Sequence, residues 1–481
     1  MLFNSFEFLF FLPLMVGIYY LTNFRYRWLV LLLGSYYFYA SAEPYLLILL
    51  LISTVTDYIC GIKMHSIHSK QRKKVFLFLS IFINLGLLFW FKYLSFFKEN
   101  LNQFLVFLGT EPFEDITQLS YTQSNILLPI GISFYTFQTM SYSIDVYRSK
   151  IVPERHFGKF ALYVAFFPQL VAGPIERASR LLPQLKQKVL LNVQNLRKGL
   201  IYVAWGLFLK VVVADRLGVY VDEVFNNTEI YQGIPLFLGY WFFSFQIYYD
   251  FSAYTAIAIG AAKTMGIDLI HNFNRPFFIS SGMQFWQRWH ISLMNWIRDY
   301  MYQPLVKKAK VSRIIAVLLV FFIVGLWHGA NWTFVLWGVL NGLFLILEVS
   351  TKPLRNRFLK VFKLPKQLIL FLGGFIVLNF VALTSIFFRS QSFSHAVLYF
   401  ENLVQLPNLH FDILGNYFEL ALCFMFIFIV QTVHYFKGNN KIHDLVLGKT
   451  KLIRWSIYLV YIGMVVLFAI NRQNNFIYFQ F

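Results

Sequence analysis

Long apolar runs separated by short polar segments are the feature that most restricts how this chain can fold. Of its 481 residues, 58% are hydrophobic and only 13% are charged, whereas soluble domains usually carry about 25% charged residues. Runs of this length can cross the hydrocarbon core of a membrane as helices. Because lipid offers no hydrogen-bond partner to an open backbone, the sequence predicts an all-α polytopic membrane protein.

The apolar runs predict a series of membrane-spanning helices within one continuous domain. No Pro/Ser-rich linker or long polar stretch interrupts the chain, so we expect residues 1–481 to form a single integral-membrane domain. We find no internal repeat of the kind that marks many secondary transporters. The predicted spans are 7–22, 28–41, 45–62, 75–97, 126–147, 199–221, 234–262, 313–328, 331–349, 368–388, 414–436 and 452–470.

The charged residues are distributed as expected for the loops of a membrane protein. The formal net charge is +20, and strongly basic loops alternate with acidic ones. Strict alternation of the spans places the basic loops on one side, which the positive-inside rule identifies as cytoplasmic, and places both termini outside. This distribution argues against nucleic-acid binding. The basic loops are 63–74, 148–159, 307–313, 352–366 and 437–454; the acidic loops are 111–115 and 222–229.

Three segments do not have the pattern of a simple span. Residues 100–121 predict a mixed extracytoplasmic loop that could include a surface helix. Residues 157–175 are apolar but broken by two prolines and a glycine, so we expect a re-entrant or interfacial segment that is buried in protein. Residues 283–303 predict one amphipathic helix. Its apolar face carries Phe285, Trp289, Leu293, Trp296 and Tyr300.

Two histidines lie within aromatic-rich, membrane-compatible sequence: His290 in RWHIS and His328 in GLWHG. A titratable side chain at membrane depth is costly and usually faces a cavity or pathway, and imidazole is the side chain best suited to moving protons near neutral pH. A structural role is the alternative for each. His328 could cap a helix end through a carbonyl, and His290 could belong to an aromatic belt at the membrane interface.

We expect the two histidines to share one site. A flat helix over 283–303 and a straight helix over 313–328 would leave them near opposite faces of the membrane, so segment 283–303 is predicted to dip into the bundle. A separation above roughly 15 Å would be incompatible with a shared site, because proton transfer needs hydrogen-bond reach.

One acid accompanies the histidines as a candidate for chemistry. Asp250 is the only acid in a long apolar run, FQIYYDFSAYT. An unpaired carboxylate there would be expensive, so structural pairing with an arginine or a hydroxyl is the favoured interpretation and a proton relay is the alternative. Trp289, Trp327 and Asn331 lie close to the histidines in the sequence and are supporting candidates.

The remaining polar candidates are basic. Lys307, Lys308 and Arg313 predict a solvated basic loop, or contacts to the phosphates of a nucleotide-like donor at the cytoplasmic face. The chain lacks a phosphate loop, a Rossmann fingerprint, a His-Glu-x-x-His zinc motif and a Gly-x-Ser-x-Gly elbow. Cys60 and Cys423 lie in apolar runs and support neither a disulfide framework nor a zinc site. A histidine-based mechanism without a metal is therefore the hypothesis.

A specific combination of stretches points to a family. It includes FFPQLVAGPIER, IYYDFSAYTAIAIG, RWHIS, GLWHG and the tail FIYFQF, and it covers 127–148, 166–177, 247–260, 272–305, 325–338 and 476–481. This combination resembles the membrane-bound O-acyltransferase family, in its bacterial alginate and peptidoglycan O-acetyltransferase-like branch. The resemblance implies a helical bundle with re-entrant and amphipathic helices around a central funnel or tunnel, with its motif-bearing core at about 127–349. It maps the family's two active-site histidines onto His290 and His328.

The resemblance also implies a function. An acyl group, most simply acetyl, would pass from a cytoplasmic thioester such as acetyl-CoA across the membrane to a cell-surface polysaccharide, peptidoglycan or alginate-like. A separate extracytoplasmic SGNH-type transferase would complete the reaction, and no cofactor would stay bound. The expected location is the bacterial cytoplasmic (inner) membrane, in contact with lipid. The alternatives are D-alanyl export for teichoic acid and, from another class, a proton-coupled secondary transporter that uses His290, His328 and Asp250.

Overall fold

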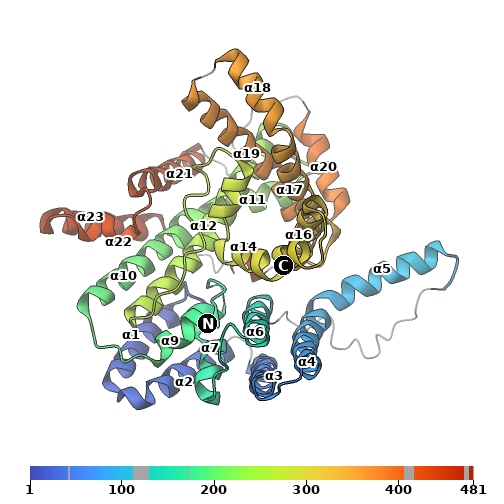
Figure 1. The fold of residues 1–481 in the computed structure, drawn as a ribbon. Coiled ribbons are helices and arrows are strands. Elements are labelled where there is room, and N and C mark those ends of the chain that lie inside the picture. The colour runs from blue at the N-terminus through green and yellow to red at the C-terminus, as the bar shows by residue number, and fades with distance from the viewer. Residues whose placement is uncertain are drawn as a thin grey trace. The chain divides into compact units, whose positions relative to one another are not determined.

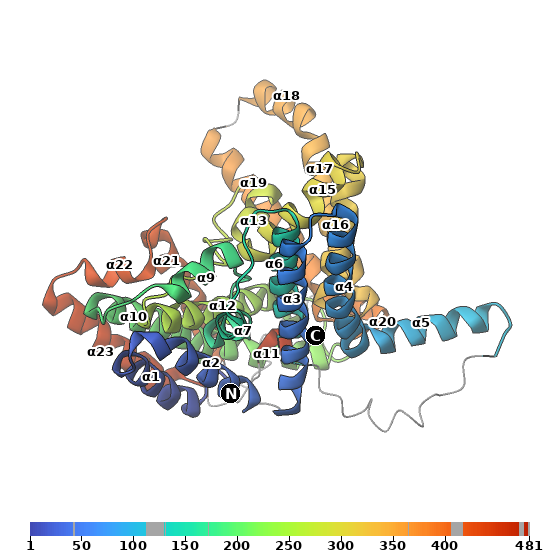
Figure 2. The ribbon, with the colours of Figure 1, turned by 60° about the horizontal axis from the view of Figure 1, so that its bottom comes forward.

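The computed structural model describes residues 1–41, 44–111, 129, 131–171, 173–363, 365–405, 417–470 and 476–479. All regular elements within these ranges are helices (Figures 1 and 2), which confirms the predicted all-α class. Their contacts form two compact units, Ser5–Leu191 with Met1 and Asn192–Phe481 with Leu2–Asn4. The single domain over 1–481 stays a prediction.

The described part of the chain holds six helices that are long and apolar enough to cross a membrane. The chain is therefore a multi-pass membrane protein. These helices are Pro44–Ser66, Lys70–Phe107, Trp332–Ser350, Lys366–Arg389, Tyr417–Lys437 and Lys451–Phe468, and two shorter apolar helices are Phe6–Leu21 and Arg313–His328.

In the first unit, three helices, α3, α4 and α6, meet at a buried carboxylate. Asp57, fully buried, accepts hydrogen bonds from the hydroxyls of Ser80 and Ser143 and from the amide of Asn84. Polar side chains hold apolar helices together in this way. The elements are α1 (Phe6–Leu21), α2 (Arg27–Ala40), α3 (Leu47–Ser66), α4 (Lys70–Leu88), the π-helical η3 (Phe89–Tyr93), α5 (Leu94–Phe107), α6 (Ile132–Tyr147), α7 (Phe157–Ala165), α8 (Phe167–Leu170) and α9 (Ala178–Lys186), with 3₁₀ turns η1 (Phe24–Tyr26) and η2 (Pro44–Leu46).

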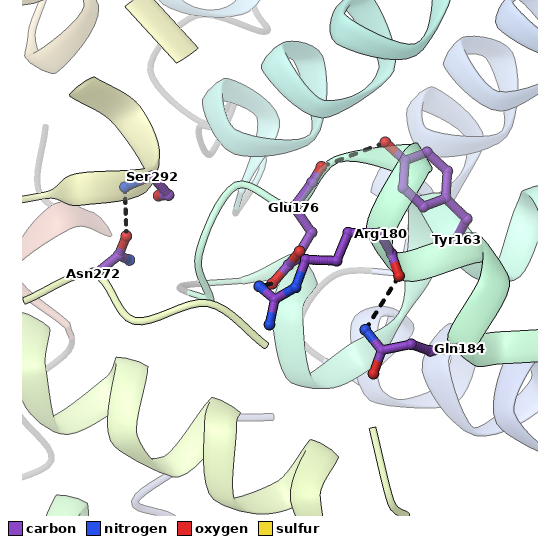
Figure 3. A network of polar contacts seen from close by, with 6 residues as sticks. All are labelled: Tyr163, Glu176, Arg180, Gln184, Asn272 and Ser292. Carbon is purple, nitrogen blue, oxygen red and sulfur yellow. Dashed lines mark hydrogen bonds and ion pairs between the residues drawn. The ribbon is translucent and has the colours of Figure 1, made fainter. Parts of the chain in front are cut away.

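The predicted break in segment 157–175 is confirmed. Helix α7 ends at Ala165, Phe166 turns the chain, and α8 follows; the side chains from Phe160 through Leu170 are buried. Backbone groups at such a break need partners inside the protein. Gln138 donates to the carbonyl of Tyr163 at 2.7 Å, and Figure 3 shows the Tyr163 hydroxyl directed at the carbonyl of Glu176.

The first part of segment 100–121 is helical, as the expected loop allowed, but this helix continues the preceding span instead of forming a separate surface helix. Helices α4 and α5 join through η3 into one 38-residue helix that continues to Phe107. No glycine or proline interrupts residues 87–108, and Gly109, with φ of 74°, ends the helix in the left-handed conformation that favours glycine. Residues 112–121 lie outside the described ranges.

The second unit contains the remaining helices. They are α10 (Val193–Leu207), the π-helical η5 (Phe208–Ala214), α11 (Asp215–Asn226), α12 (Ile234–Thr264), α13 (Gly282–Arg288), α14 (Ile291–Ile297), the π-helical η6 (Arg298–Tyr302), α15 (Gln303–Lys307), α16 (Arg313–His328), α17 (Trp332–Ser350), α18 (Lys352–Phe362), α19 (Lys366–Arg389), α20 (Phe393–Leu403), α21 (Tyr417–Lys437), α22 (Ile442–Leu447), α23 (Lys451–Phe468) and the 3₁₀ turn η7 (Ile477–Phe479).

Glycines let two pairs of helices in this unit touch at the backbone. A Cβ on Gly206 of α10 would lie 2.6 Å from the carbonyl oxygen of Ala253 in α12. On α16, a Cβ on Gly325 would lie 2.4 Å from the carbonyl oxygen of Phe334 in α17. Such close approach is how small residues pack membrane helices. The first pair brings η5 next to the middle of α12, and the second fixes the end of α16, where His328 lies.

Candidate functional site

His328 is the last residue of α16 and is enclosed by aromatic rings. Its side chain is buried, with 4% exposure. The residue after it, Gly329, has an extended φ of −158°, so it does not form a left-handed turn. Glycine fits here because a Cβ would lie 2.2 Å from the ring of Phe334. The rings around His328, by centroid distance, are Trp327 at 4.9 Å, Trp337 and Phe388 at 5.2 Å, and Tyr478 at 5.5 Å.

His290 lies at a break, and the prediction of one helix over 283–303 is wrong. Helix α13 ends at Arg288 and α14 begins at Ile291. His290 between them has φ of 45° and ψ of 50°, a left-handed conformation that few non-glycine residues adopt. The break turns the imidazole inward, where it is 1% exposed. This confirms that the segment enters the protein interior rather than lying flat on its surface.

Asn272 holds that break in place. Its carbonyl accepts a hydrogen bond from the backbone N–H of Ile291 at 2.9 Å, and its side-chain oxygen accepts from the N–H of Ser292 at 3.3 Å, as Figure 3 shows for the second bond. Asn272 is fully buried. Sequence reasoning missed this residue, because NFNRPF gave no sign that its first asparagine would bind the backbone beside a histidine 18 positions later.

The predicted apolar face of segment 283–303 is largely confirmed despite the break. Phe285, Trp289, Leu293 and Trp296 are buried. The supporting candidate Trp289 stacks on Phe285 at 5.4 Å and meets Phe273 edge-on at 5.3 Å, so it packs the junction of α13 and α14.

Trp327 connects the two histidines. Its indole lies 6.0 Å from the imidazole of His290 and 4.9 Å from that of His328, between ring centroids. The imidazoles are therefore closer than the roughly 15 Å that would exclude a shared site. A second path of ring contacts runs from His290 to Phe251 at 4.7 Å, to Tyr478 at 4.8 Å and to His328 at 5.5 Å. The structure thus places both histidines in one aromatic environment.

Asp250 is paired, but with a lysine rather than the expected arginine or hydroxyl. Its Oδ1 lies 2.9 Å from the Nζ of Lys210 in η5, and Lys210 also lies 2.8 Å from Asp215. The other oxygen of Asp250 accepts the backbone N–H of Ile477 at 2.8 Å. Sequence reasoning overlooked Lys210. This lysine is the single cation in the apolar run FLKVVVA, and that position was a signal that it needs a buried partner.

The other supporting candidates lie at the surface or have structural contacts. Asn331 caps α17: its side chain accepts the N–H of Thr333 at 3.0 Å and donates to the carbonyl of Gln391 at 3.1 Å. Lys307 and Lys308 are exposed. Arg313 lines a cavity of about 510 Å³ that also reaches Ile291, the residue after His290.

A more polar cavity approaches His290 from a different set of residues. It has a volume of about 280 Å³ and is lined by Ile291, which directly follows the break, by Asn272, which binds Ile291, and by three basic residues, Arg275, Lys437 and Lys441. None of the described lining residues is acidic. The cavity therefore suits an anionic group close to the histidine.

Histidine, cysteine and acidic side chains form no group of three or more that could hold a metal ion, as far as the described residues extend. Cys60 and Cys423 are buried free thiols.

Comparison with known proteins gives consistent matches. The model of the membrane-bound O-acyltransferase family matches residues 114–390, which include both histidines. A probable alginate O-acetylase, AlgI, of Pseudomonas syringae pv. tomato is 38% identical over 362 residues, covering 73% of this chain and 68% of the relative. The peptidoglycan O-acetyltransferase of Helicobacter pylori is 34% identical over 409 residues, 79% and 73% respectively. The teichoic acid D-alanyltransferase of Streptococcus thermophilus is 28% identical over 265 residues, 52% and 63%.

Proposed function

Because the chain belongs to the membrane-bound O-acyltransferase family, we propose that it moves an acetyl group from a cytoplasmic thioester across the bacterial inner membrane, for O-acetylation of a cell-surface polysaccharide. Relatives named as alginate or peptidoglycan O-acetylases are 34–38% identical to it. Those named as teichoic acid D-alanyltransferases are 26–28% identical and match about half of the chain. Acetyl transfer is therefore favoured over D-alanyl transfer, and acyl transfer over the transporter alternative.

The observation that carries the proposal is the contact of His290 and His328 with one indole, that of Trp327. His328 takes the proton from the accepting hydroxyl as a general base, or accepts the acyl group itself as a transient acyl-imidazole. In either route the thioester C–S bond breaks and a C–O bond forms at the acceptor, and the proton removed from the hydroxyl goes to the leaving thiolate. His290 orients the thioester carbonyl, or delivers that proton to the leaving thiolate.

The aromatic surroundings serve this chemistry by excluding water. An activated acyl group hydrolyses if water reaches it, and a closed apolar site prevents that side reaction. The four rings around His328 and the edge-on contact of Phe251 with His290 supply such a wall.

The donor is an acyl thioester such as acetyl-CoA, and its anionic part needs cations near the site. We assign this role to Arg275, Lys437 and Lys441 in the 280 Å³ cavity, because that cavity also reaches Asn272 and Ile291 beside His290. Lys307, Lys308 and Arg313 are the alternative donor contacts. On the extracytoplasmic side, an SGNH-type transferase would pass the acetyl group to the glycan.

Alkaline release of ester-linked groups tests the proposal. A strain that lacks the gene is complemented with the wild-type chain, His328→Ala, His290→Ala or the exposed-histidine control His68→Ala, and each protein is quantified in the membrane fraction. Polysaccharide acetate should vanish with His328→Ala, fall by about 10²–10⁴ with His290→Ala, and stay unchanged with His68→Ala. Wild-type acetate in the His328→Ala strain would overturn the assignment, and release of D-alanine instead would identify the other branch.

A further inference from the structure

Three charged side chains form a buried cluster in the same unit as the two histidines. Lys210 lies between two carboxylates, 2.8 Å from Asp215 and 2.9 Å from Asp250, and all three side chains are at most 4% exposed. Buried charges of this kind are tolerated when they are paired and hydrogen-bonded. Lys210 contacts Oδ1 of Asp250, which leaves Oδ2 to accept a hydrogen bond from a further donor.

That donor comes from the C-terminal segment. The backbone N–H of Ile477, the first residue of η7, donates to Oδ2 of Asp250 at 2.8 Å. A three-residue turn has no stable conformation alone, because one hydrogen-bonded turn does not offset the entropy of ordering it. The position of η7 therefore depends on what it binds.

The chain leading to η7 is bound at the same place. The N–H of Ile470 donates to the carbonyl of Val211 at 2.9 Å, and Val211 follows Lys210 in the π-helical η5. Arg216, at the start of α11, donates to the carbonyl of Phe468 at 2.8 Å. π-helical turns are frequent at functional positions. Residues of η5 and the start of α11 thus bind the end of α23 and a residue shortly after it, whereas Asp250 of α12 binds the start of η7.

The bound segment contributes directly to the wall of the histidine site. Phe476 is fully buried and its ring lies 4.4 Å from that of Tyr254. The ring of Tyr478 lies 4.8 Å from Phe251 and 5.5 Å from His328. Phe251 is also 4.7 Å from His290. Tyr478 of this segment therefore completes the second chain of ring contacts, which runs from His290 through Phe251 and Tyr478 to His328.

We infer that Lys210 and Asp250 hold the C-terminal segment 476–479 against the two histidines; we call this pair and its bond to Ile477 the clasp. Both residues are positioning residues for acyl transfer. Lys210 orients the Asp250 carboxylate, and Asp250 in turn holds the N–H of Ile477, which sets Tyr478 beside His328. The inference rests on the proposed function only for its effect on transfer; the position of the segment can be measured independently.

Two neutral replacements of Asp250 isolate the clasp. Asp250→Ala and Asp250→Asn remove the same charge and leave Lys210 paired with Asp215, but only asparagine keeps an acceptor for the Ile477 N–H. The readout is maleimide labelling of Ile477→Cys, at a position that is 4% exposed in the parent, in a background without Cys60 and Cys423. Labelling should be about tenfold faster with Asp250→Ala, the size expected for one lost buried hydrogen bond, and close to the parent rate with Asp250→Asn.

Acetylation is measured in the same pair without the reporter cysteine. It should fall with Asp250→Ala and be rescued substantially by Asp250→Asn, whereas Asp222→Asn, which breaks the ion pair of Asp222 with Arg389, should leave it unchanged. Ile477→Pro removes the donor instead of the acceptor and should reproduce the loss. Combined with Asp250→Ala, it should add no further loss.

Each outcome decides a separate point. Unchanged labelling of the Ile477→Cys reporter with Asp250→Ala would refute the clasp, whatever happens to acetylation. Faster labelling with wild-type acetylation would refute the positioning role. If Asp250→Ala fails to accumulate, a full effect of Ile477→Pro supports the clasp and a wild-type level contradicts it. Failure of the proposed function would appear as wild-type acetate with His328→Ala, a result that leaves the labelling comparison intact.

Discussion

The imidazole of His290 lies 6.0 Å from the indole of Trp327, between ring centroids. Trp327 directly precedes His328 in the chain, so the end of α16 supplies one histidine and also the ring that meets the other. This contact depends on two backbone features: the left-handed turn at His290 and the close packing of α16 on α17. The two histidines come together because separate helices end or break at the same place.

Replacing Trp327 tests how much the shared indole contributes. Trp327→Ala should lower polysaccharide acetate by about a hundredfold, because misplacement of reacting groups by about 1 Å can cost that much. Trp327→Phe keeps an aromatic ring and should retain more activity. Trp332→Ala, which removes an indole that is 54% exposed, is the control. Equal acetate for Trp327→Ala and the control would show that the indole is dispensable.

The backbone at His290 predicts an unusual order of stability between two variants of this histidine. His290→Gly should unfold at a higher temperature than His290→Ala, because a non-glycine residue with φ of 45° is strained by about 1–2 kcal/mol and glycine is not. Thermal unfolding of the detergent-solubilised proteins measures the difference. A lower midpoint for the glycine variant would contradict the left-handed turn.

The sequence predicted most of the helices because apolar length is a local property. Most predicted spans correspond to one described helix, with 199–221 divided among α10, η5 and α11, and the break in segment 157–175 followed from its prolines and glycine. His290 and His328 were identified from short motifs around each residue. In contrast, the apolar periodicity of 283–303 continues through the break at His290, since Trp289 and Leu293 are buried on both sides of it. Periodicity therefore gave no sign of the turn.

The parts that could not be predicted depend on contacts between distant residues. Lys210 and Asp250 are 40 positions apart, and Asp250 and Ile477 are 227 apart. Hydropathy treats a lysine and an aspartate in separate spans as two unfavourable residues, although in the folded chain they form an ion pair. The segment 476–479 is too short for any periodic pattern, so its position beside His328 becomes visible only in the folded chain.

The glycines at the α16–α17 contact should be intolerant of alanine. A Cβ at Gly325 or Gly338 would lie 2.4 or 2.3 Å from a carbonyl oxygen, and backbone cannot move aside cheaply. Gly325→Ala should lower the free energy of unfolding by about 1–3 kcal/mol and reduce acetylation, because the end of α16 carries His328. Gly463→Ala in α23, where the added Cβ would have open space, is the matched control. Equal unfolding midpoints for the two variants would contradict this packing.

Acid should weaken the first unit through Glu154. Burial alone raises the pKa of this carboxyl, but the Lys186 ammonium and the backbone N–H of His156, at 2.9 Å, hold it below its usual 4.5. The carboxylate therefore stabilises the fold fully above the unfolded-state pKa, and this stabilisation is lost as the pH falls through the lower folded-state pKa. Below pH ~4.5 the unfolding midpoint of the wild type should fall more steeply than that of Glu154→Gln. Parallel curves would exclude the contribution.

The side of the membrane that receives the donor follows from charge alternation and can be read with single cysteines. In a background without Cys60 and Cys423, Ser69→Cys should react with an impermeant maleimide only after the cells are permeabilised, because Ser69 lies in the basic loop 63–74. Glu229→Cys, in the acidic loop, should react in intact cells. Asn439→Cys lies in the loop that supplies Lys437 and Lys441 to the 280 Å³ cavity, and it should follow Ser69→Cys. If the Asn439→Cys variant instead reacts in intact cells, the cavity opens where no cytoplasmic thioester is present, and its basic residues are not the donor contacts.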